Sequence, residues 1–316
     1  MRQMAPILCM AILVMTATVS QASDEAASIA DAVSISAALS RQSHTFSISE
    51  TDSEHEIPYE TNVTWDLGIR TSYLGAALGF SVDAPWSRGV EDKGQSDYYA
   101  VEGSYFRRSF GAEASWKRYH GFYVPRDSLR NPVNHDYPQQ PNLTCTNAGL
   151  YLYYFFDERF SYRAAFQQTE RAHAISSSFI LMGFSTFSRN ESDRSLILPS
   201  ESTYFEGLSG LESFRFISTG LSGGYAFSIP RGPFFLSSAL LFGDAVQHQR
   251  FYTTGKTINR VMAWNPSMLL RVAAGYTGDT YFGGMLFTVD SNQTHYRRVR
   301  IDLLTVQFSI NSGTMW

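Results

Sequence analysis

Charged side chains occupy positions of one parity in several segments where apolar residues occupy the other. In residues 63–73, for example, Trp65, Leu67 and Ile69 share one face and the polar positions share the opposite face. Successive side chains of a β-strand point to opposite faces. If the apolar positions face lipid, seven charged residues point into the lumen of a barrel: Asp66, Arg70, Glu102, Glu113, Lys117, Arg163 and Arg271.

Two roles are open for these charged residues. Opposite charges inside a narrow barrel can pair and fill it, because a buried charge is costly unless it has a partner. Rings of charged side chains can also select what passes through a pore. We therefore expect either a packed lumen or a selective pathway for a small polar solute. Conductance separates the two, since a filled lumen passes nothing.

Other motifs give no site. The histidines lack an HExxH pair and a Cys/His cluster, and they fall in expected loops or at strand ends: His44, His55, His120, His135, His173, His248 and His295. Residues 220–224 fit a nucleophile elbow, but Ser222 lies within an unbroken alternation rather than at a sharp strand-to-helix turn. We expect no catalytic residue, no metal, no cofactor and no nucleic-acid partner.

The strands that must position the charges are clearest in residues 150–167. Leu150, Leu152, Tyr154 and Phe156 share one parity, a turn follows at Asp157-Glu158, and a second run carries Phe160, Tyr162, Ala164 and Phe166 on one face. This pattern predicts two strands joined by a tight turn. Aromatic residues bracket the turn, as is typical of strands that end at a membrane interface.

Composition agrees with a membrane barrel. Aromatic residues make up 15% of the 316 residues, although the mean hydropathy is only -0.18. Charged residues make up 17%, against about 25% in typical soluble domains. Phe and Tyr favour strands, and no stretch of the mature chain reaches the length of a membrane helix.

The N-terminus predicts export. Residues 1–22 combine a basic start, an apolar run at residues 5–17 and small residues before Ala22, which indicates a signal peptide cleaved near Ala22. The apolar run is too short for a transmembrane anchor, which needs about 20 residues. Cys145 is then the remaining cysteine, so no internal disulfide is expected. We expect a flexible periplasmic segment at residues 23–43 and the barrel at residues 44–316.

Loop lengths bear on the number of strands. A barrel with both ends in the periplasm has an even count, with short turns on one rim. The strong alternating segments number twelve, and the weak segments His44–Asp52 and Ser195–Pro199 raise the count to fourteen. With fourteen strands, every short turn falls on one rim of the barrel and is flanked by aromatic residues. We predict an all-β fold, a single antiparallel transmembrane β-barrel of about fourteen strands, with twelve as the fallback.

Several blocks of the sequence resemble an uncharacterised family of Gram-negative outer-membrane β-barrels, defined only as a domain of unknown function. The blocks span roughly residues 62–309 and include YYAVEGSYFRRSFGAEASWKRYHGFYVPR, FDERFSYRAAFQQTERAHAISSSFILMG, LSGGYAFSIP and RVAAGYTGDTYFGG. The resemblance implies a barrel and brings no catalytic residue. Trp316 is similar to the closing aromatic residue recognised by the barrel-assembly machinery, and with Phe308 and Ile310 it forms a candidate assembly signal, although Ser312 and Thr314 depart from the usual apolar pattern.

Three functions remain open. The first is a small pore, or a scaffold with surface-exposed binding loops, in the outer membrane of a Gram-negative bacterium. The second is a lipid-modifying hydrolase that would use His120 and Ser128. The third is a soluble periplasmic β-sandwich. The expected partners are outer-membrane lipids, the barrel-assembly machinery and a small polar solute.

Overall fold

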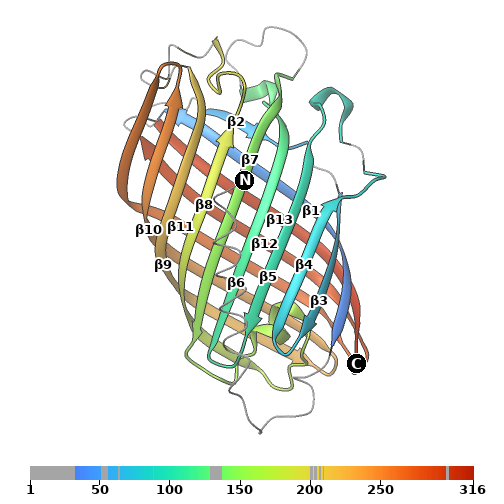
Figure 1. The fold of residues 1–316 in the computed structure, drawn as a ribbon. Helices are drawn as coiled ribbons and strands as arrows, with labels where there is room; N and C mark the ends of the chain where they lie inside the picture. Colours follow the sequence, from blue (N-terminus) through green and yellow to red (C-terminus); the bar gives the residue numbers. More distant parts are fainter. Residues whose placement is uncertain are drawn as a thin grey trace.

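The chain folds into one antiparallel sheet that closes on itself (Figure 1). The computed structural model describes residues 33–50, 56–62, 65–87, 89–128, 137–199, 202, 205, 208, 210–296 and 299–316. Within them the strands are β1 (Ser34–Glu50), β2 (Glu56–Glu60), β3 (Trp65–Tyr73), β4 (Ala76–Asp83), β5 (Asp97–Phe106), β6 (Phe110–Tyr123), β7 (Gln139–Phe155), β8 (Ser176–Glu191), β9 (Leu211–Arg231), β10 (Phe234–Thr253), β11 (Lys256–Thr277), β12 (Tyr281–Tyr296) and β13 (Val299–Met315). The short helical segments are η1 (Glu91–Lys93), η2 (Arg126–Ser128) and η3 (Arg163–Gln167).

Pairing of the first and last strands closes the barrel. β1 and β13 pair from Ser34 opposite Met315 to Glu50 opposite Val299. The ring therefore contains every described strand except β2, which makes twelve of the thirteen in the sheet. The antiparallel barrel is confirmed, and its closed ring has the lower of the two expected strand counts. A single closed sheet also excludes the β-sandwich, which needs two packed sheets.

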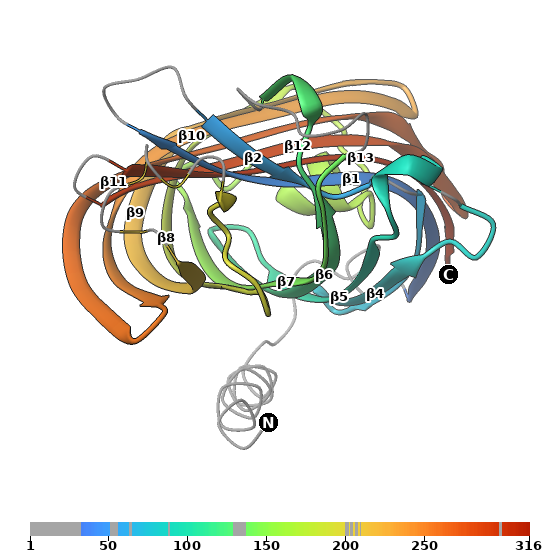
Figure 2. The same ribbon diagram turned by 90° about the horizontal axis from the view of Figure 1, so that it is seen from above.

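The wall of the barrel has unequal height. β3, β4 and β5 contain 9, 8 and 10 residues, whereas β9, β10 and β11 contain 21, 20 and 22. β3 pairs with one half of β1 and β2 pairs with the other half. β2 also meets β6, where Glu60 lies opposite Tyr123. The short strand thus continues the wall between β1 and β6, and Figure 2 shows it beside β1.

The two ends of the barrel differ in their connections. One end, the turn rim, carries the short connections after β3, β5, β9 and β11 and the junction of β1 with β13. Val33 and Trp316 exchange two backbone hydrogen bonds of 3.0 Å there. The opposite end, the loop rim, carries the long connections after β4, β6 and β8. The loop rim also carries a short connection, because only Thr254 and Gly255 join β10 to β11, and the long connection between β7 and β8 lies on the turn rim. The prediction that every short turn shares one rim is therefore wrong.

Tight geometry selects glycine in the turn between β3 and β4. Leu74 and Gly75 both have positive φ, of 50° and 83°, as a two-residue hairpin turn requires. A Cβ atom at Gly75 would lie 2.6 Å from the carbonyl oxygen of Phe106. Glycine at this position therefore lets the turn pack against the neighbouring hairpin.

The outer surface of the barrel is an apolar band. Ile69, Leu221 and Phe242 are 66%, 64% and 58% exposed on their strands, as side chains facing lipid would be. Exposed aromatic residues line the turn rim, among them Tyr73, Phe110, Phe156, Phe234 and Tyr281. Other aromatic residues expected in that girdle point inward and are buried: Phe106, Phe155, Phe160 and Phe235.

The first strand begins earlier than expected. β1 starts at Ser34, so the boundary placed at His44 is wrong, as is a flexible segment reaching residue 43. Small inward residues such as Ser36 and Ala38 gave this half of the strand a weak pattern. Ser195–Pro199 is not a strand either. Leu196 and Ile197 are consecutive and both buried, which a strand with one solvent face or lipid face does not allow.

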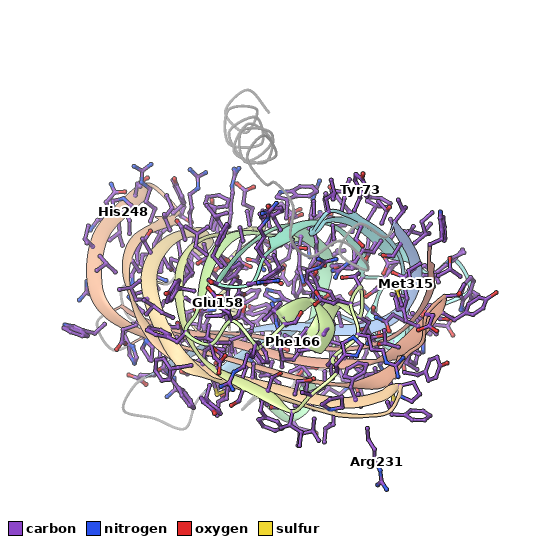
Figure 3. All side chains as sticks on the ribbon, turned by 90° about the horizontal axis from the view of Figure 1, so that it is seen from below. Tyr73, Glu158, Phe166, Arg231, His248 and Met315 are labelled. Atoms are coloured by element: carbon purple, nitrogen blue, oxygen red, sulfur yellow. The ribbon has the colours of Figure 1, made fainter. Side chains whose placement is uncertain are left out.

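The largest departure lies between β7 and β8. Residues 160–167, expected as a strand, instead run inside the barrel and include the π-helical turn η3. Phe166 lies within the ring of strands, whereas Tyr73 and Arg231 point outward (Figure 3). The backbone of the inserted segment forms local hydrogen bonds, since the N–H of Ala165 donates to the carbonyl of Ser161 at 3.0 Å. A segment inside a barrel has no neighbouring strand edge to pair with, so local bonding takes precedence over the alternating pattern.

In the described part of the chain, no helix is both long and apolar enough to cross a membrane.

Two apolar clusters fill the interior. The cap cluster lies toward the loop rim and joins inward residues of β1, β2, β5, β6, β7, β9, β10 and β13 with residues of the adjoining connections. Its largest members include Phe46, Tyr59, Phe122, Phe205, Phe214, Phe216 and Phe251. The plug cluster lies toward the turn rim and packs Phe160, Tyr162, Ala165 and Phe166 against the wall, on Phe106, Tyr153, Phe155 and Phe235 among others.

Candidate functional site

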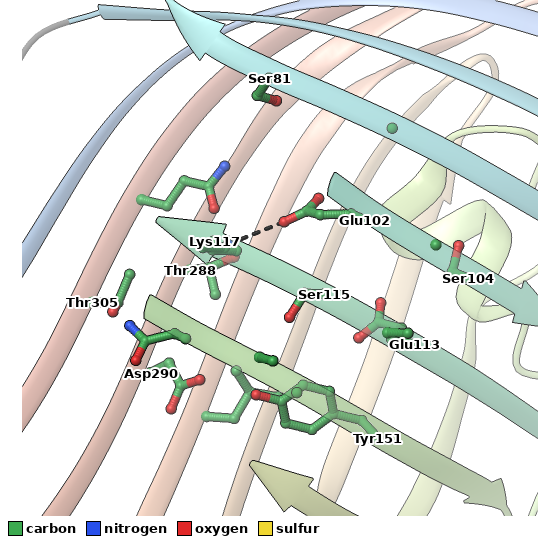
Figure 4. Close-up of a pocket in the computed structure, with 18 of the residues that line it drawn as sticks. Ser81, Glu102, Ser104, Glu113, Ser115, Lys117, Tyr151, Thr288, Asp290 and Thr305 are labelled. Carbon is green, nitrogen blue, oxygen red and sulfur yellow. Dashed lines mark ion pairs between the residues drawn. The ribbon is translucent and has the colours of Figure 1, made fainter. Parts of the chain in front are cut away.

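A polar chamber separates the two clusters. It has a volume of about 270 Å³ and is lined by residues from all twelve strands of the ring, together with Tyr162, Phe166 and Gln167 of the inserted segment. Five of the seven charges predicted to face the lumen line it: Arg70, Glu102, Glu113, Lys117 and Arg271. Figure 4 shows Glu102, Glu113 and Lys117 among them. The period of two in the sequence was therefore sufficient to place them on the inner face.

One group of charges is built on neighbouring strands. Glu102 of β5 accepts from Lys117 of β6 at 3.0 Å and from Arg70 of β3 at 3.2 Å. Gly79 of β4 lies between Arg70 and Glu102 in the same cross-strand row. Because glycine has no side chain, the two charged side chains meet over it. The sequence supplied both charges, but only the strand register shows why they pair.

A second ion pair crosses the lumen. Arg271 of β11 donates from Nη1 and Nη2 to the two carboxylate oxygens of Glu113 on β6, each at 2.9 Å. β7 to β10 separate these strands around the ring, so the pair joins opposite walls. Tyr153 donates to Glu113 at 2.7 Å, and Arg271 also contacts the hydroxyl of Tyr162. The network thus connects both walls to the inserted segment.

The charges of the chamber balance. Its lining contains three basic residues, Arg70, Lys117 and Arg271, and three acidic residues, Glu102, Glu113 and Asp290. Asp290 accepts from Asn292 at 3.0 Å. It was not among the predicted residues, because the prediction for this segment rested on its apolar positions. A balanced, hydroxyl-rich lining is suited to a neutral polar molecule or to water rather than to one type of ion.

The other two predicted residues lie outside the chamber lining. Asp66 is buried on β3, directly opposite Asp83 of β4. Arg163 belongs to η3 rather than to a strand, and its guanidinium lies 3.8 Å from Glu170 and 3.4 Å from the hydroxyl of Thr169. The prediction that Arg163 projects from a strand into the lumen is therefore wrong, although its side chain is inside the barrel.

A buried histidine and cysteine lie where the chamber meets the cap cluster. His44 Nε2 is 3.1 Å from Sγ of Cys145, His44 Nδ1 is 2.9 Å from the hydroxyl of Thr305, and the imidazole stacks on Tyr119 at 4.5 Å. An imidazole beside a thiol could activate a nucleophile, but Cys145 is fully buried and does not line the chamber. This contact could not be predicted, because 101 positions of the sequence separate the two residues.

The residues proposed for lipid hydrolysis are not joined. His120 Nδ1 lies 2.9 Å from the hydroxyl of Thr144, and Ser128 belongs to η2. Among the described residues, no hydrogen bond connects His120 with Ser128. In the same part of the chain, no group of three or more His, Cys, Asp and Glu side chains is arranged to hold a metal ion.

The sequence profile of one protein family, described as a domain of unknown function (DUF4421), matches residues 28–313. The chain belongs to this family. The comparison with curated proteins found no match. The DUF4421 match begins before the first described strand and includes all of β1 to β12, so the barrel is the family's domain.

Solved structures share the barrel shape with this DUF4421 protein at low identity. The outer membrane protease OmpT from Escherichia coli has 8% identity and a TM-score of 0.45, with 93% of this chain and 99% of that chain covered. The translocator domain of the autotransporter NalP from Neisseria meningitidis has 12% identity and a TM-score of 0.45, with 99% and 97% covered. The toluene transporter TodX from Pseudomonas putida has 8% identity and a TM-score of 0.30, with 94% and 91% covered.

The candidate assembly residues of the DUF4421 protein lie on or after the closing strand. Ile310 and Trp316 are 45% and 66% exposed, and Phe308 is half-buried. On β13, Phe308 is paired with Arg41 of β1 and Ile310 is paired with Leu39 of β1. The candidate assembly residues therefore lie at the junction of β1 and β13, which closes the ring.

Proposed function

We propose that this protein is a non-conducting outer-membrane barrel that acts as a scaffold for binding surfaces at its loop rim. Contacts between opposite walls carry this proposal. Phe46 of β1 packs against Phe214 of β9 with ring centroids 5.5 Å apart, and Arg271 binds Glu113 across the lumen at 2.9 Å. A lumen crossed at two levels leaves no continuous aqueous path.

The cap cluster supports a permanent closure. Most of its members project from the strands of the wall, and Phe46, Ile57, Tyr59, Phe214 and Phe251 are fully buried. Burial of each large apolar side chain contributes roughly 1.5–3 kcal/mol. Opening a path through this cluster would expose several such side chains at once, which makes an open state costly.

Ordered connections at the loop rim support the binding role. Asn62 donates to the carbonyls of Val90 and Gly94 at 2.8 and 2.5 Å, and it accepts from the N–H of Val90 at 3.0 Å. Lys93 donates to Tyr123 at 2.9 Å, and the guanidinium of Arg126 lies 4.3 Å from the ring centre of Tyr137. Loops fixed in this way lose little entropy when a partner binds.

The proposal includes a location and partners. Cleavage near Ala22 would release the chain into the periplasm of a Gram-negative bacterium, where Phe308, Ile310 and Trp316 would serve as the signal for the barrel-assembly machinery. The apolar band would then contact outer-membrane lipids, with the turn rim in the periplasm. We also propose that the protein has no lipid-hydrolase activity, because His120 pairs with Thr144.

Membrane fractionation, gel mobility and planar-bilayer recording test this proposal together. We expect a protein that needs detergent for extraction, migrates faster when unheated and gives no steady conductance. A freely soluble protein would contradict the membrane location. Steady wild-type conductance that changes in Arg271→Ala would contradict the scaffold and support a charged pore.

A gated pathway is the second candidate, and the balanced chamber favours it. The turn-rim closure comes from one inserted connection rather than from the wall. If that connection moves, a small neutral polar solute could enter the chamber. Passage across the membrane would then also require a path through the cap cluster, at the cost described above. Swelling of protein-containing liposomes in glycerol and in a disaccharide distinguishes the two functions: a scaffold admits neither above protein-free liposomes, whereas a gated pathway admits glycerol faster.

A further inference from the structure

Three arginines form a row on the outer surface of the barrel, near the loop rim. Arg189 of β8 lies directly opposite Arg215 of β9, and Arg215 lies directly opposite Arg250 of β10. They share the parity of Ile217, which is 45% exposed on the outer face. The row therefore projects from the wall rather than into the lumen.

The row marks an edge of the apolar band. Moving from Arg215 toward the turn rim, the outward positions of β9 include Ile217 and Leu221, and on β10 they include Val246 and Phe242, all of them exposed. This edge is where the headgroups of the surrounding lipid layer would meet the barrel. The arginines thus lie at headgroup depth, directly above side chains at acyl-chain depth.

Like charges in directly opposed positions are unfavourable, so this row requires compensation. Glu191 pairs with Arg189. In the part of the chain that the structure describes, no carboxylate pairs with Arg215 or Arg250. Two adjacent arginines therefore retain their capacity to bind an anion.

The surface between these strands is hollowed. A groove of about 110 Å³ is lined by Arg215, Ile217, His248 and Arg250, and His248 points outward from the barrel (Figure 3). The guanidinium of Arg215 lies 5.8 Å from the ring centre of Phe187, and its Nε atom is buried without a hydrogen-bond partner. The groove thus combines unpaired cationic donors with an apolar wall.

We propose that this groove binds the phosphate group of a phosphorylated membrane lipid whose acyl chains lie along Ile217, Leu221 and Val246. The planar guanidinium groups of Arg215 and Arg250 offer paired N–H donors, which match phosphate oxygens. The apolar side chains below them select a lipid over a free anion. The site depends on the barrel lying in a membrane and not on whether its lumen conducts.

Lipid binding to the full-length protein in detergent micelles tests the site, with diphosphorylated lipid A as the probe and native mass spectrometry as the readout. The test variant is Arg215→Gln with Arg250→Gln. The matched control is Arg231→Gln, which removes an exposed arginine at the turn rim. We expect the double variant to bind lipid A at least about tenfold more weakly, a change of about 1.4 kcal/mol, and the control to bind as the wild type does. Equal affinity in the double variant and the wild type would overturn the proposal.

Two further measurements keep the test decisive. Phosphatidylcholine and inorganic phosphate serve as comparison ligands, and equal retention of either one would overturn the assignment to a phosphorylated lipid. Heat-modifiability of each variant reports its fold. If the double variant does not fold, the wild-type protein is tested at two salt concentrations instead. Its affinity for lipid A should be lower in 1 M salt than in 0.1 M salt if exposed arginines bind the phosphate. The reason is that the screening length falls from about 10 Å to about 3 Å over this range. Salt-independent binding would contradict the proposal.

Discussion

The two ends of the lumen are closed by different means. At the loop rim, the cap cluster is made largely of side chains that project from the wall itself, from β1, β2, β5, β6, β7, β9, β10 and β13. At the turn rim, the plug cluster depends on one connection between β7 and β8 that folds back into the barrel. A closure built from the wall opens only if the barrel unfolds, whereas a closure built from one connection can open while the strands remain paired.

The largest expected effect comes from the cap cluster. Phe46 is fully buried and contacts the rings of Tyr59, Phe122 and Phe214. Removal of a buried phenyl ring costs about 3–5 kcal/mol, so Phe46→Ala should lower the free energy of unfolding by that amount in urea titrations of the refolded protein. Phe80→Ala is the control, because Phe80 is 53% exposed on the outer face. Equal losses in the two variants would show that the cap cluster does not stabilise the barrel.

The ion pair across the chamber should have a smaller effect. Arg271→Ala leaves Glu113 without its bidentate partner, and an unsatisfied buried group costs about 1–3 kcal/mol. Urea titration measures this loss. The double variant Arg271→Met with Glu113→Leu should recover part of it, because an apolar pair leaves no charge unpaired. No recovery would indicate that the chamber is wet enough to solvate Glu113.

Thiol labelling compares the two closures directly. Cys145 belongs to the cap cluster and is fully buried, and Ser115→Cys places a second thiol in the chamber lining. In Ser115→Cys, the added change Phe166→Ala should raise labelling at position 115 roughly tenfold, as expected for a change of about 1.4 kcal/mol in local opening. Cys145 should stay unlabelled. Parallel labelling of both thiols would mean that the two closures open together.

The smallest effect is expected at the turn rim. Hydrogen bonds from Arg159 lower the pKa of the Asp157 carboxyl to about 2. The ionised form is favoured in the folded state, so any stabilisation is present at neutral pH and is lost only as the pH falls toward that value. Because the pair is exposed, Asp157→Asn should leave the urea midpoint at pH 7 unchanged. A clear shift would show that the turn holds the inserted connection in place.

The sequence predicted the membrane-level wall well. The alternation in β9, β10 and β11 places apolar residues outward, and five of the predicted charges line the chamber, because a period of two is a local property that one segment contains. The pairing partners could not be predicted. Glu113 and Arg271 lie 158 positions apart, and only the curvature of the closed sheet brings them together.

Apolar side chains pack on protein rather than on lipid in two parts of the barrel. Apolar positions of an alternating strand face lipid only within the apolar band. Phe214 and Phe216 are apolar and point inward, because the wall there extends beyond the band and encloses a core. Phe160, Tyr162 and Phe166 are apolar and alternate, yet the inserted segment buries them inside the barrel. In both places an apolar side chain packs on protein, and alternation alone does not distinguish protein from lipid.

The seam between β1 and β13 has a kinetic consequence. Ser34 pairs with Met315, so the contacts that complete the ring join residues separated by almost the whole chain. Such contacts form late, since a long loop must be ordered before any of them stabilises the fold. Until then the outer edge of β1 carries unpaired backbone groups, which invite pairing with another chain. Slow refolding and a tendency to aggregate at high protein concentration therefore follow from the same register that makes the finished barrel free of edges.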